Sequence, residues 1–283
     1  MSEFFSIFEY AFFRNAIASA LLTSVLAAMV GTYIVSRKIV FISGGITHAS
    51  FGGIGMAYFL GLNPFLGAAI FAVFSATGIE WISKKGNVRE DSAIAILWSL
   101  GMAVGIIFVF MTPGYTPDLM TFLFGNILSV TMAELILLAA FCLLTALFFW
   151  IFYRPLLHTA FDPEFSQIMG IPVAFFRYAM AVIIALSIVI SIRAVGIILV
   201  LSLFTIPQIT AMLFTRDFRK IIPLAAFWAA LGSVMGIFLS YFLNIPAGAT
   251  IICYLTLQFL LVKLFVISKD ALKRQGPGKV HKG

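Results

Sequence analysis

The sequence predicts an all-α protein that crosses a membrane many times. Hydrophobic residues make up 62% of its 283 residues and charged residues only 10%, against about 45–50% and about 25% in soluble domains. Apolar runs of about 20 residues, enough to cross a hydrocarbon core of about 30 Å, recur along the whole chain. A soluble chain cannot cover so much apolar surface with so few charges. We therefore expect a single transmembrane domain over residues 1–270.

Nine segments are long and apolar enough to be predicted as spans. Arg193 interrupts an almost continuous apolar stretch between the sixth and seventh segments, so eight spans remain open as the alternative to nine. The predicted spans are 11–35, 41–60, 64–83, 93–111, 132–153, 174–192, 195–214, 221–243 and 248–267.

One apolar stretch is too short to span. Residues 117–131 contain about a dozen apolar residues, fewer than a crossing helix needs. The pair Gly125 and Asn126 interrupts the stretch and is typical of a helix end. We predict a short re-entrant or interfacial helix there, on the outer face.

Basic residues gather in the connections that alternate spans place on one side. Counting Arg177 and Lys263 at that face, the side holds 16 of the 18 Lys and Arg residues. By the positive-inside tendency it is the cytoplasm, so the C-terminus is predicted to be cytoplasmic. The net charge of +7 therefore indicates orientation, and no nucleic-acid partner is expected. Residues 271–283 form a basic tail, which we predict to be disordered.

The connection 154–172 contains the sequence "FDPEFSQIMGIP", which predicts a short capped helix. Asp162 can accept hydrogen bonds from the free N–H groups of the first turn, and proline suits the first helical position that follows it. Glu164 adds negative charge at the positive end of the helix dipole. Gly170 suits the left-handed position past the helix end.

This short helix would expose one apolar face. Phe165, Ile168 and Met169 lie at positions i, i+3 and i+4, which share a face. Two interpretations stay open. The face packs against the membrane-embedded ends of its own chain, or it inserts as a coupling helix into a groove on another protein.

His48 is the one histidine within a predicted span, and glycines surround it. On a helix, Gly44, Gly45, Gly52 and Gly55 lie at −4, −3, +4 and +7 from His48, so one face is nearly bare backbone. Small residues in this pattern are typical of close helix packing. The same face would also line a passage for a small solute or ion, and an ionisable side chain within a span usually faces such a path.

The chemistry of His48 suits a passing metal better than a bound one. Neutral imidazole is a common ligand for zinc and related divalent metals. A stable zinc site needs three or four ligands, so His48 alone predicts a transient contact and no stably bound cofactor.

A proline interrupts the span 195–214. Pro207 removes one helix hydrogen bond and is expected to kink the span. Thr205, Gln208 and Thr210 are placed to satisfy the freed carbonyl. A kink of this kind either lines a pathway or serves packing alone.

Three further side chains carry simple structural expectations. Glu80 lies four residues before Lys84, a spacing that predicts an ion pair at the cytoplasmic edge. Cys142 and Cys253 lie inside apolar runs and are expected to be buried packing residues.

Several stretches, in order across about 200 residues, carry a resemblance to a known family: "GGITHASFGGIGMAYFLG" (44–61), "REDSAIAILWSLGMAVGII" (89–107), "DPEFSQIMGIP" (162–172), "VGIILVLSLFTIPQITAMLF" (195–214) and, more weakly, "NIPAGATI" (244–251). With these stretches the sequence resembles the membrane subunit of bacterial ATP-binding-cassette importers for zinc, manganese or iron. The resemblance implies a homodimeric permease with a central path, in the type II importer architecture of the vitamin B12 permease, located in the bacterial cytoplasmic (inner) membrane.

The resemblance also implies partners and site residues. A separate cytoplasmic ATP-binding subunit would dock on the coupling helix 162–170, and a metal-binding protein would dock on the outer face. His48 falls on the family's Ser-His-Ala motif, written here Thr47-His48-Ala49. The family commonly has an aspartate four residues earlier, where this chain has Gly44. A ligand would then come from elsewhere, such as Asp118 or Glu134, or the solute is a different one.

Together these features predict a permease subunit that moves a divalent transition-metal ion into the cytoplasm. The chain has no Gly-rich phosphate loop, so another chain would hydrolyse ATP. Import of a chelated metal or another small solute is the first alternative, and an ATP-independent secondary transporter or channel is the second. An enzyme ranks last, since no nucleophile, base and orienting group can be assembled. The expected path residues are Gly44, Thr47, His48, Gly52, Gly55, Pro207 and Gln208, and the expected coupling residues are Asp162, Glu164, Phe165, Ile168, Met169 and Gly170.

Overall fold

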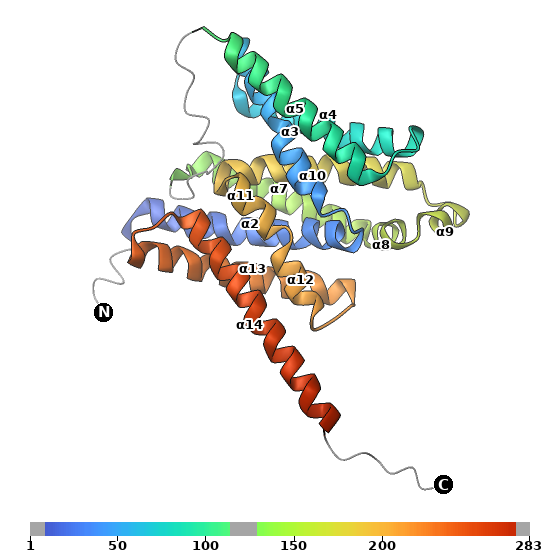
Figure 1. Ribbon diagram of the computed structural model, residues 1–283, viewed down its shortest axis with the longest axis vertical. Coiled ribbons are helices and arrows are strands. Elements are labelled where there is room, and N and C mark those ends of the chain that lie inside the picture. Colours follow the sequence, from blue (N-terminus) through green and yellow to red (C-terminus); the bar gives the residue numbers. More distant parts are fainter. Residues whose placement is uncertain (1–8, 114–128, 276–283) are drawn as a thin grey trace.

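The computed structural model describes residues 9–113 and 129–275, and every regular element in this part of the chain is a helix. Figure 1 shows most of the long helices running side by side, with α14 inclined away from the bundle. In chain order the helices are α2 (Ala11–Ser36), α3 (Phe41–Phe59), α4 (Pro64–Lys85), α5 (Glu90–Met111), α7 (Met132–Ile151), α8 (Tyr153–Phe161), α9 (Pro163–Ile168), α10 (Val173–Val195), α11 (Ile197–Leu203), α12 (Ile206–Met212), α13 (Phe218–Leu243) and α14 (Ala247–Gln275).

The described helices include seven that are long and apolar enough to cross a membrane: α2, α4, α5, α7, α10, α13 and α14. Two of the segments predicted as spans fall outside this set for different reasons. Helix α3 has 19 residues, but its glycines, hydroxyl groups and histidine lower its hydropathy. The segment 195–214 is divided into α11 and α12, each of 7 residues.

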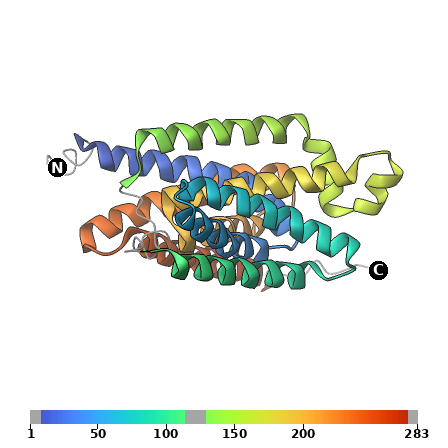
Figure 2. The same ribbon diagram turned by 90° about the horizontal axis from the view of Figure 1, so that it is seen from above.

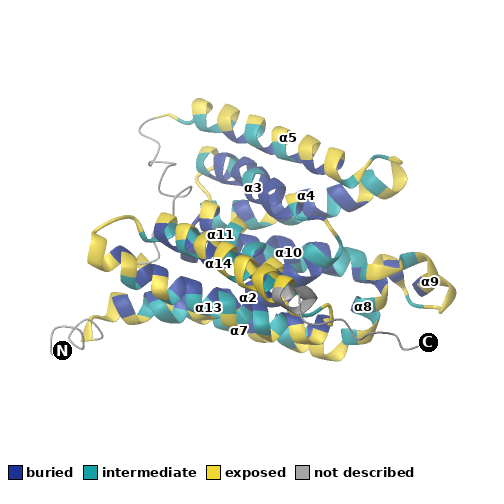
Figure 3. Ribbon diagram, turned by 60° about the horizontal axis from the view of Figure 1, so that its bottom comes forward, coloured by how far each residue is buried: buried dark blue, intermediate teal, exposed yellow. Residues whose placement is uncertain are grey.

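One end of the bundle gathers the basic residues. Helices α2, α4 and α7 finish there and α5, α10 and α13 begin there, so we call it the basic end. It lies to the right in Figure 1, where α8 and α9 extend beyond the other helices. The core lies between α2 and α10, whose facing side chains, such as Leu26, Val30, Ile184 and Ile188, are buried. Figure 3 shows this buried interior between exposed outer faces.

Helix α3 packs against α4 and α5 with almost no side chain between the backbones. A Cβ added at Gly53 would collide with the carbonyl oxygen of Gly67 in α4, and one added at Gly101 in α5 would lie 2.5 Å from the Cα of Ala49. Only glycine permits such close approach. Within lipid the hydrophobic effect does not drive helices together, so they associate by close packing through small residues. The three helices therefore form one tightly packed unit.

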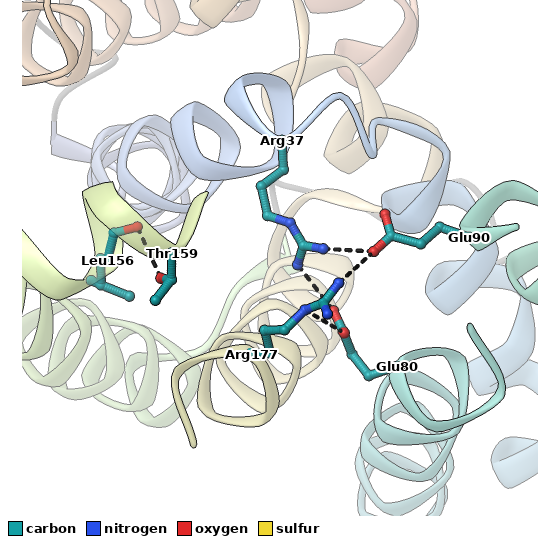
Figure 4. A network of polar contacts seen from close by, with 6 residues as sticks. All are labelled: Arg37, Glu80, Glu90, Leu156, Thr159 and Arg177. Atoms are coloured by element: carbon teal, nitrogen blue, oxygen red, sulfur yellow. Dashed lines mark hydrogen bonds and ion pairs between the residues drawn. The ribbon is translucent and has the colours of Figure 1, made fainter. Parts of the chain in front are cut away.

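Four charged residues join this unit to α2 and α10 at the basic end. Arg37, which follows α2, contacts Glu80 of α4 at 3.0 Å and Glu90 of α5 at 2.6 Å. Arg177 of α10 contacts the same two carboxylates, each at 3.2 Å. Figure 4 shows the two guanidinium groups between the two carboxylates. Burial lowers the pKa of Arg37, but Tyr33 and the two carboxylates raise it above its ordinary value overall, so Arg37 stays charged.

The ion pair predicted between Glu80 and Lys84 is therefore wrong. Glu80 is buried and both of its carboxylate oxygens face guanidinium groups, whereas Lys84 is exposed. The interhelical pairs replace the local pair because a buried carboxylate needs close, directional partners. The cysteine prediction is half right, since Cys142 is buried and Cys253 is exposed.

Two further predictions concern the chain's less regular parts. The interfacial helix expected within 117–131 falls almost wholly outside the described residues. Helix α14 continues to Gln275, so the first residues of the predicted tail 271–283 are helical, and 276–283 lie outside the described part.

The packing of α3 gives a first testable prediction. Gly53→Ala is expected to destabilise the protein by about 1–3 kcal/mol, the usual cost of overpacking, because the new methyl group would collide with the backbone of α4. Gly44→Ala is the matched control on the same helix, since its Cβ would find its nearest neighbour at 3.7 Å. Thermal melting of the purified variants in detergent measures the difference. Equal melting temperatures would contradict the assignment of Gly53 to close packing.

Candidate transport path and coupling surface

His48 is the one residue of the stretch 42–55 that is not buried. Its imidazole stacks on the indole of Trp98 in α5, with ring centroids 4.6 Å apart and planes 3° from parallel. A parallel stack of two flat rings fixes the plane of the imidazole while leaving its edge free. The structure therefore presents one oriented, half-buried imidazole at the surface of the protomer.

The surface around His48 is apolar and has room. A Cβ at Gly44, one helical turn before His48, would meet Trp98 at 3.7 Å and Leu201 of α11 at 3.9 Å, both ordinary contact distances. Leu201 and Ile198 of α11 are exposed beside it. We call this surface, formed by Gly44, His48, Trp98, Ile198 and Leu201, the His48 face.

Three of the expected path residues on α3 lie inside the protomer instead. A Cβ at Gly52 would lie 2.8 Å from the carbonyl oxygen of Gly101, and one at Gly55 would collide with α5 in the same way. Thr47 is buried and donates its hydroxyl hydrogen to the carbonyl of Ser43 at 2.6 Å. Gly52 and Gly55 thus serve the contact between α3 and α5, and they are not brought to the His48 face.

The kinked segment is held by Gln208. Its side-chain Nε2 donates to the carbonyl of Ala27 in α2 at 2.7 Å and to the carbonyl of Leu203 at 3.1 Å. The second bond satisfies a carbonyl at the break that precedes Pro207, as predicted for this residue. Pro207 and Gln208 are both buried, so within one protomer they anchor the break between α11 and α12 to α2.

Further metal ligands do not converge on His48 among the described residues. No group of three or more His, Cys, Asp or Glu side chains in that part of the chain is placed to hold a metal ion. Glu134 caps the start of α7 and pairs with Arg193 at 2.5 Å, so it already has a partner. Asp118 lies outside the described residues.

The predicted short helix is present as α9. The Oδ1 of Asp162 accepts a hydrogen bond from the backbone N–H of Phe165 at 2.9 Å, which caps the first turn. Ser166 is buried and bonds back to the carbonyl of Asp162 at 2.7 Å. Gly170 has φ +76°, the left-handed conformation that favours glycine past a helix end. The local sequence therefore determines this helix, and its cap and end prediction is confirmed.

The apolar face of α9 is open. Phe165, Ile168 and Met169 are 48%, 83% and 64% exposed, and α9 lies at the far right of Figure 1, beyond the basic ends of the long helices. Among the described residues, the chain does not cover these three side chains. An exposed apolar group on a short, rigidly capped helix is typical of a docking surface.

Sequence reasoning missed two groups of residues. Trp98 of α5 contacts His48 of α3. No residue spacing within α5 predicts this contact between helices. Arg37 and Arg177 are separated by 140 positions in the sequence, so their shared carboxylates become visible only in three dimensions. The nearest signal was the presence of Glu80 within the apolar span 64–83, since buried carboxylates require cationic partners.

The long apolar helices define a multi-pass membrane protein. The model of the ABC 3 transport family matches residues 9–266, and the chain belongs to this family. The resemblance identified from the sequence is therefore confirmed.

Relatives of known description cover nearly the whole chain. The manganese transport system membrane protein MntC of Halalkalibacterium halodurans is 32% identical over 276 residues, which cover 98% of this chain and 94% of MntC. The structure of PsaBC from Streptococcus pneumoniae in complex with Fab is 32% identical, with a TM-score of 0.81 over 92% of this chain and 94% of that chain. The structure of a metal-chelate type ABC transporter in an inward-facing conformation matches this chain with a TM-score of 0.71, over 89% of this chain and 85% of that chain. Because the two sequences are only 17% identical, this match shows a likeness of fold alone.

Proposed function

We propose that this protein is the permease subunit of an ATP-binding-cassette importer that moves a divalent transition-metal ion into the cytoplasm. The relatives named for manganese transport support a metal cargo, and the observation that carries the proposal is the oriented imidazole of His48 at an open apolar surface. Zinc, manganese and iron all remain within the proposed class, and the chain itself has no ATPase role.

The His48 face supports a homodimer with a central path. Ionisable side chains that face lipid are costly, by about 2.5–3.5 kcal/mol for Arg, Lys and Asp on insertion scales, so a partner is expected to cover His48. A second copy, apposed on the same face, would enclose two imidazoles without exposing either to lipid, as two-fold interfaces do. Helices α5 and α14 carry long exposed apolar rows, including Ile106 and Leu261, that such an interface would also bury.

The basic end is the cytoplasmic side in this proposal. Its Lys and Arg residues follow the positive-inside tendency, and it carries the exposed face of α9 for a separate ATP-binding subunit. A metal-binding protein would then dock at the opposite end, outside the cell, and the protein would lie in the bacterial cytoplasmic membrane with its C-terminus inside. Helix α3 and the α11–α12 segment would bring the number of membrane-crossing segments to nine.

His48 gives the central test. His48→Ala is expected to lower uptake of the transported metal by about tenfold or more, the scale on which single supporting groups affect metal sites. Uptake of radioactive zinc, manganese and iron into cells that depend on this importer measures it. Ser50→Ala is the matched control on α3, because Ser50 is buried and its hydroxyl bonds only to Thr47. Unchanged uptake of all three metals by His48→Ala would overturn the role of His48.

The coupling helix gives a second test. Phe165→Asp is expected to abolish stable association with the ATP-binding subunit, because it places a charge in the centre of the apolar face of α9. Copurification and stimulated ATP hydrolysis measure it. Gln167→Asp adds the same charge on the other side of the same helix, where Gln167 is exposed, and should leave both unchanged. An intact, fully active complex carrying Phe165→Asp would show that the subunit docks elsewhere or is not needed.

One observation favours a second candidate cargo, a chelated metal or other small solute. The described carboxylates lie at helix ends, and the best buried of them, Glu80, is paired with arginine. The His48 face offers aromatic and aliphatic surface beside a single nitrogen ligand, which suits a cargo that brings its own ligands. A free manganese ion prefers carboxylate and water oxygens, and this face has no carboxylate.

Gly44→Asp separates the two cargoes. The added carboxylate would lie one turn from His48 on the same face, where the two can share one ion, and the site has room for its Cβ. If free ions pass, we expect manganese uptake to rise relative to zinc uptake, and Gly44→Ala to leave the ratio unchanged. If Gly44→Asp leaves the uptake of free ions as it was, the chelated cargo is favoured.

A further inference from the structure

A hollow of about 670 Å³ lies at the basic end, among α2, α7, α8 and α13, away from the His48 face. Its lining changes character along its depth. Met29 and Phe149 are apolar residues within the spans, whereas Arg154 and Arg219 stand at its mouth, where α8 and α13 begin. An apolar hollow with a cationic mouth is complementary to an amphiphile with a negative head group.

The two arginines are free to meet such a head group. Neither forms an ion pair with a carboxylate of the described residues, and both are exposed. The guanidinium of Arg219 lies 4.7 Å from the centre of the Tyr153 ring. This contact orients the guanidinium and leaves its N–H groups free to donate hydrogen bonds. Arginine in this state is well suited to bind phosphate through paired hydrogen bonds.

The position of the hollow points to lipid. On α7, Leu143, Leu144 and Trp150 are 71%, 63% and 79% exposed, so the hollow opens beside a broad apolar flank. Figure 2 shows α7 and α5 on opposite sides of the bundle, which keeps this flank apart from the face proposed for the second copy. Tryptophan and tyrosine at the end of a span are typical of the membrane–water boundary.

We propose that this hollow, which we call the α7–α13 hollow, is a binding site for an anionic phospholipid. Arg154 and Arg219 bind the phosphodiester, and the acyl chains lie along Met29, Phe149 and Ile222. Basic pockets between helices on the cytoplasmic side of membrane proteins bind anionic head groups in this way. A zwitterionic lipid would leave the two positive charges unbalanced, and a free phosphate would leave the apolar lining uncovered.

Native mass spectrometry of the full-length permease in neutral detergent tests the proposal. Phosphatidylglycerol and phosphatidylcholine are titrated separately, and bound lipid is counted. We expect one tight phosphatidylglycerol per chain, with apparent affinity reduced on the order of tenfold in Arg154→Gln/Arg219→Gln, the effect of losing charge-assisted hydrogen bonds. Arg154→Lys/Arg219→Lys retains the charge and should recover part of the affinity.

The controls make each outcome decisive. Lys84→Gln/Lys85→Gln removes two exposed charges at the same end but outside the hollow, and should bind lipid as the unmodified chain does. Equal affinity in the Arg154→Gln/Arg219→Gln variant, at an unchanged melting temperature, would overturn the site. So would equal binding of phosphatidylcholine, which would indicate apolar adhesion, or full competition by inorganic phosphate, which would indicate a free-anion site. None of these readouts depends on metal transport.

Discussion

The backbone-to-backbone packing of α3 is the constraint on which the rest of the structure depends. In lipid, every peptide group must be satisfied within the protein, and helices gain from approaching closely through small residues. Here α3 presents Gly53 to α4 and meets Gly101 of α5 with Ala49. These contacts bury nearly every residue of the stretch 42–55 and leave the imidazole of His48 as the side chain that is not buried. The glycine contacts of α3 therefore determine which way the His48 side chain points.

The ion network joins this packed unit to α10 at the end of the bundle that carries α9. Glu80 and Glu90 belong to α4 and α5, which hold α3, and Arg177 belongs to α10, which follows α9 after four residues. Helix α9 therefore directly precedes α10 in the chain, and α10 is tied by these ion pairs to the unit that carries His48. Breaking a buried pair leaves an uncompensated charge, at a cost of about 3–5 kcal/mol. The unit and α10 are accordingly expected to move together and not to slide past one another.

The sequence predicted the fold well because each span is a local signal. Hydrophobic length, proline and glycine placed seven of the nine predicted spans within three residues of their observed bounds, whereas α14 ends eight residues beyond its predicted end and 195–214 is divided into α11 and α12. The cap at Asp162 with the turn at Gly170 predicted α9 in detail. The site was predicted less completely because it depends on contacts between helices. The spacing of Gly52 and Gly55 around His48 was visible, but whether a glycine face meets another helix or an open path is decided by α5. The partners of Glu80 were missed for the same reason, since Arg37 and Arg177 come from distant parts of the chain.

In the proposed homodimer, one protomer supplies only part of the site around His48. A lone imidazole binds a metal weakly, and tight closed coordination would hold the cargo in place of passing it on. Stacking on Trp98 fixes the plane of the ring, so an apposed second copy would bring a second imidazole at a defined angle. Two nitrogen ligands with water completing the shell give a site that can be entered and left.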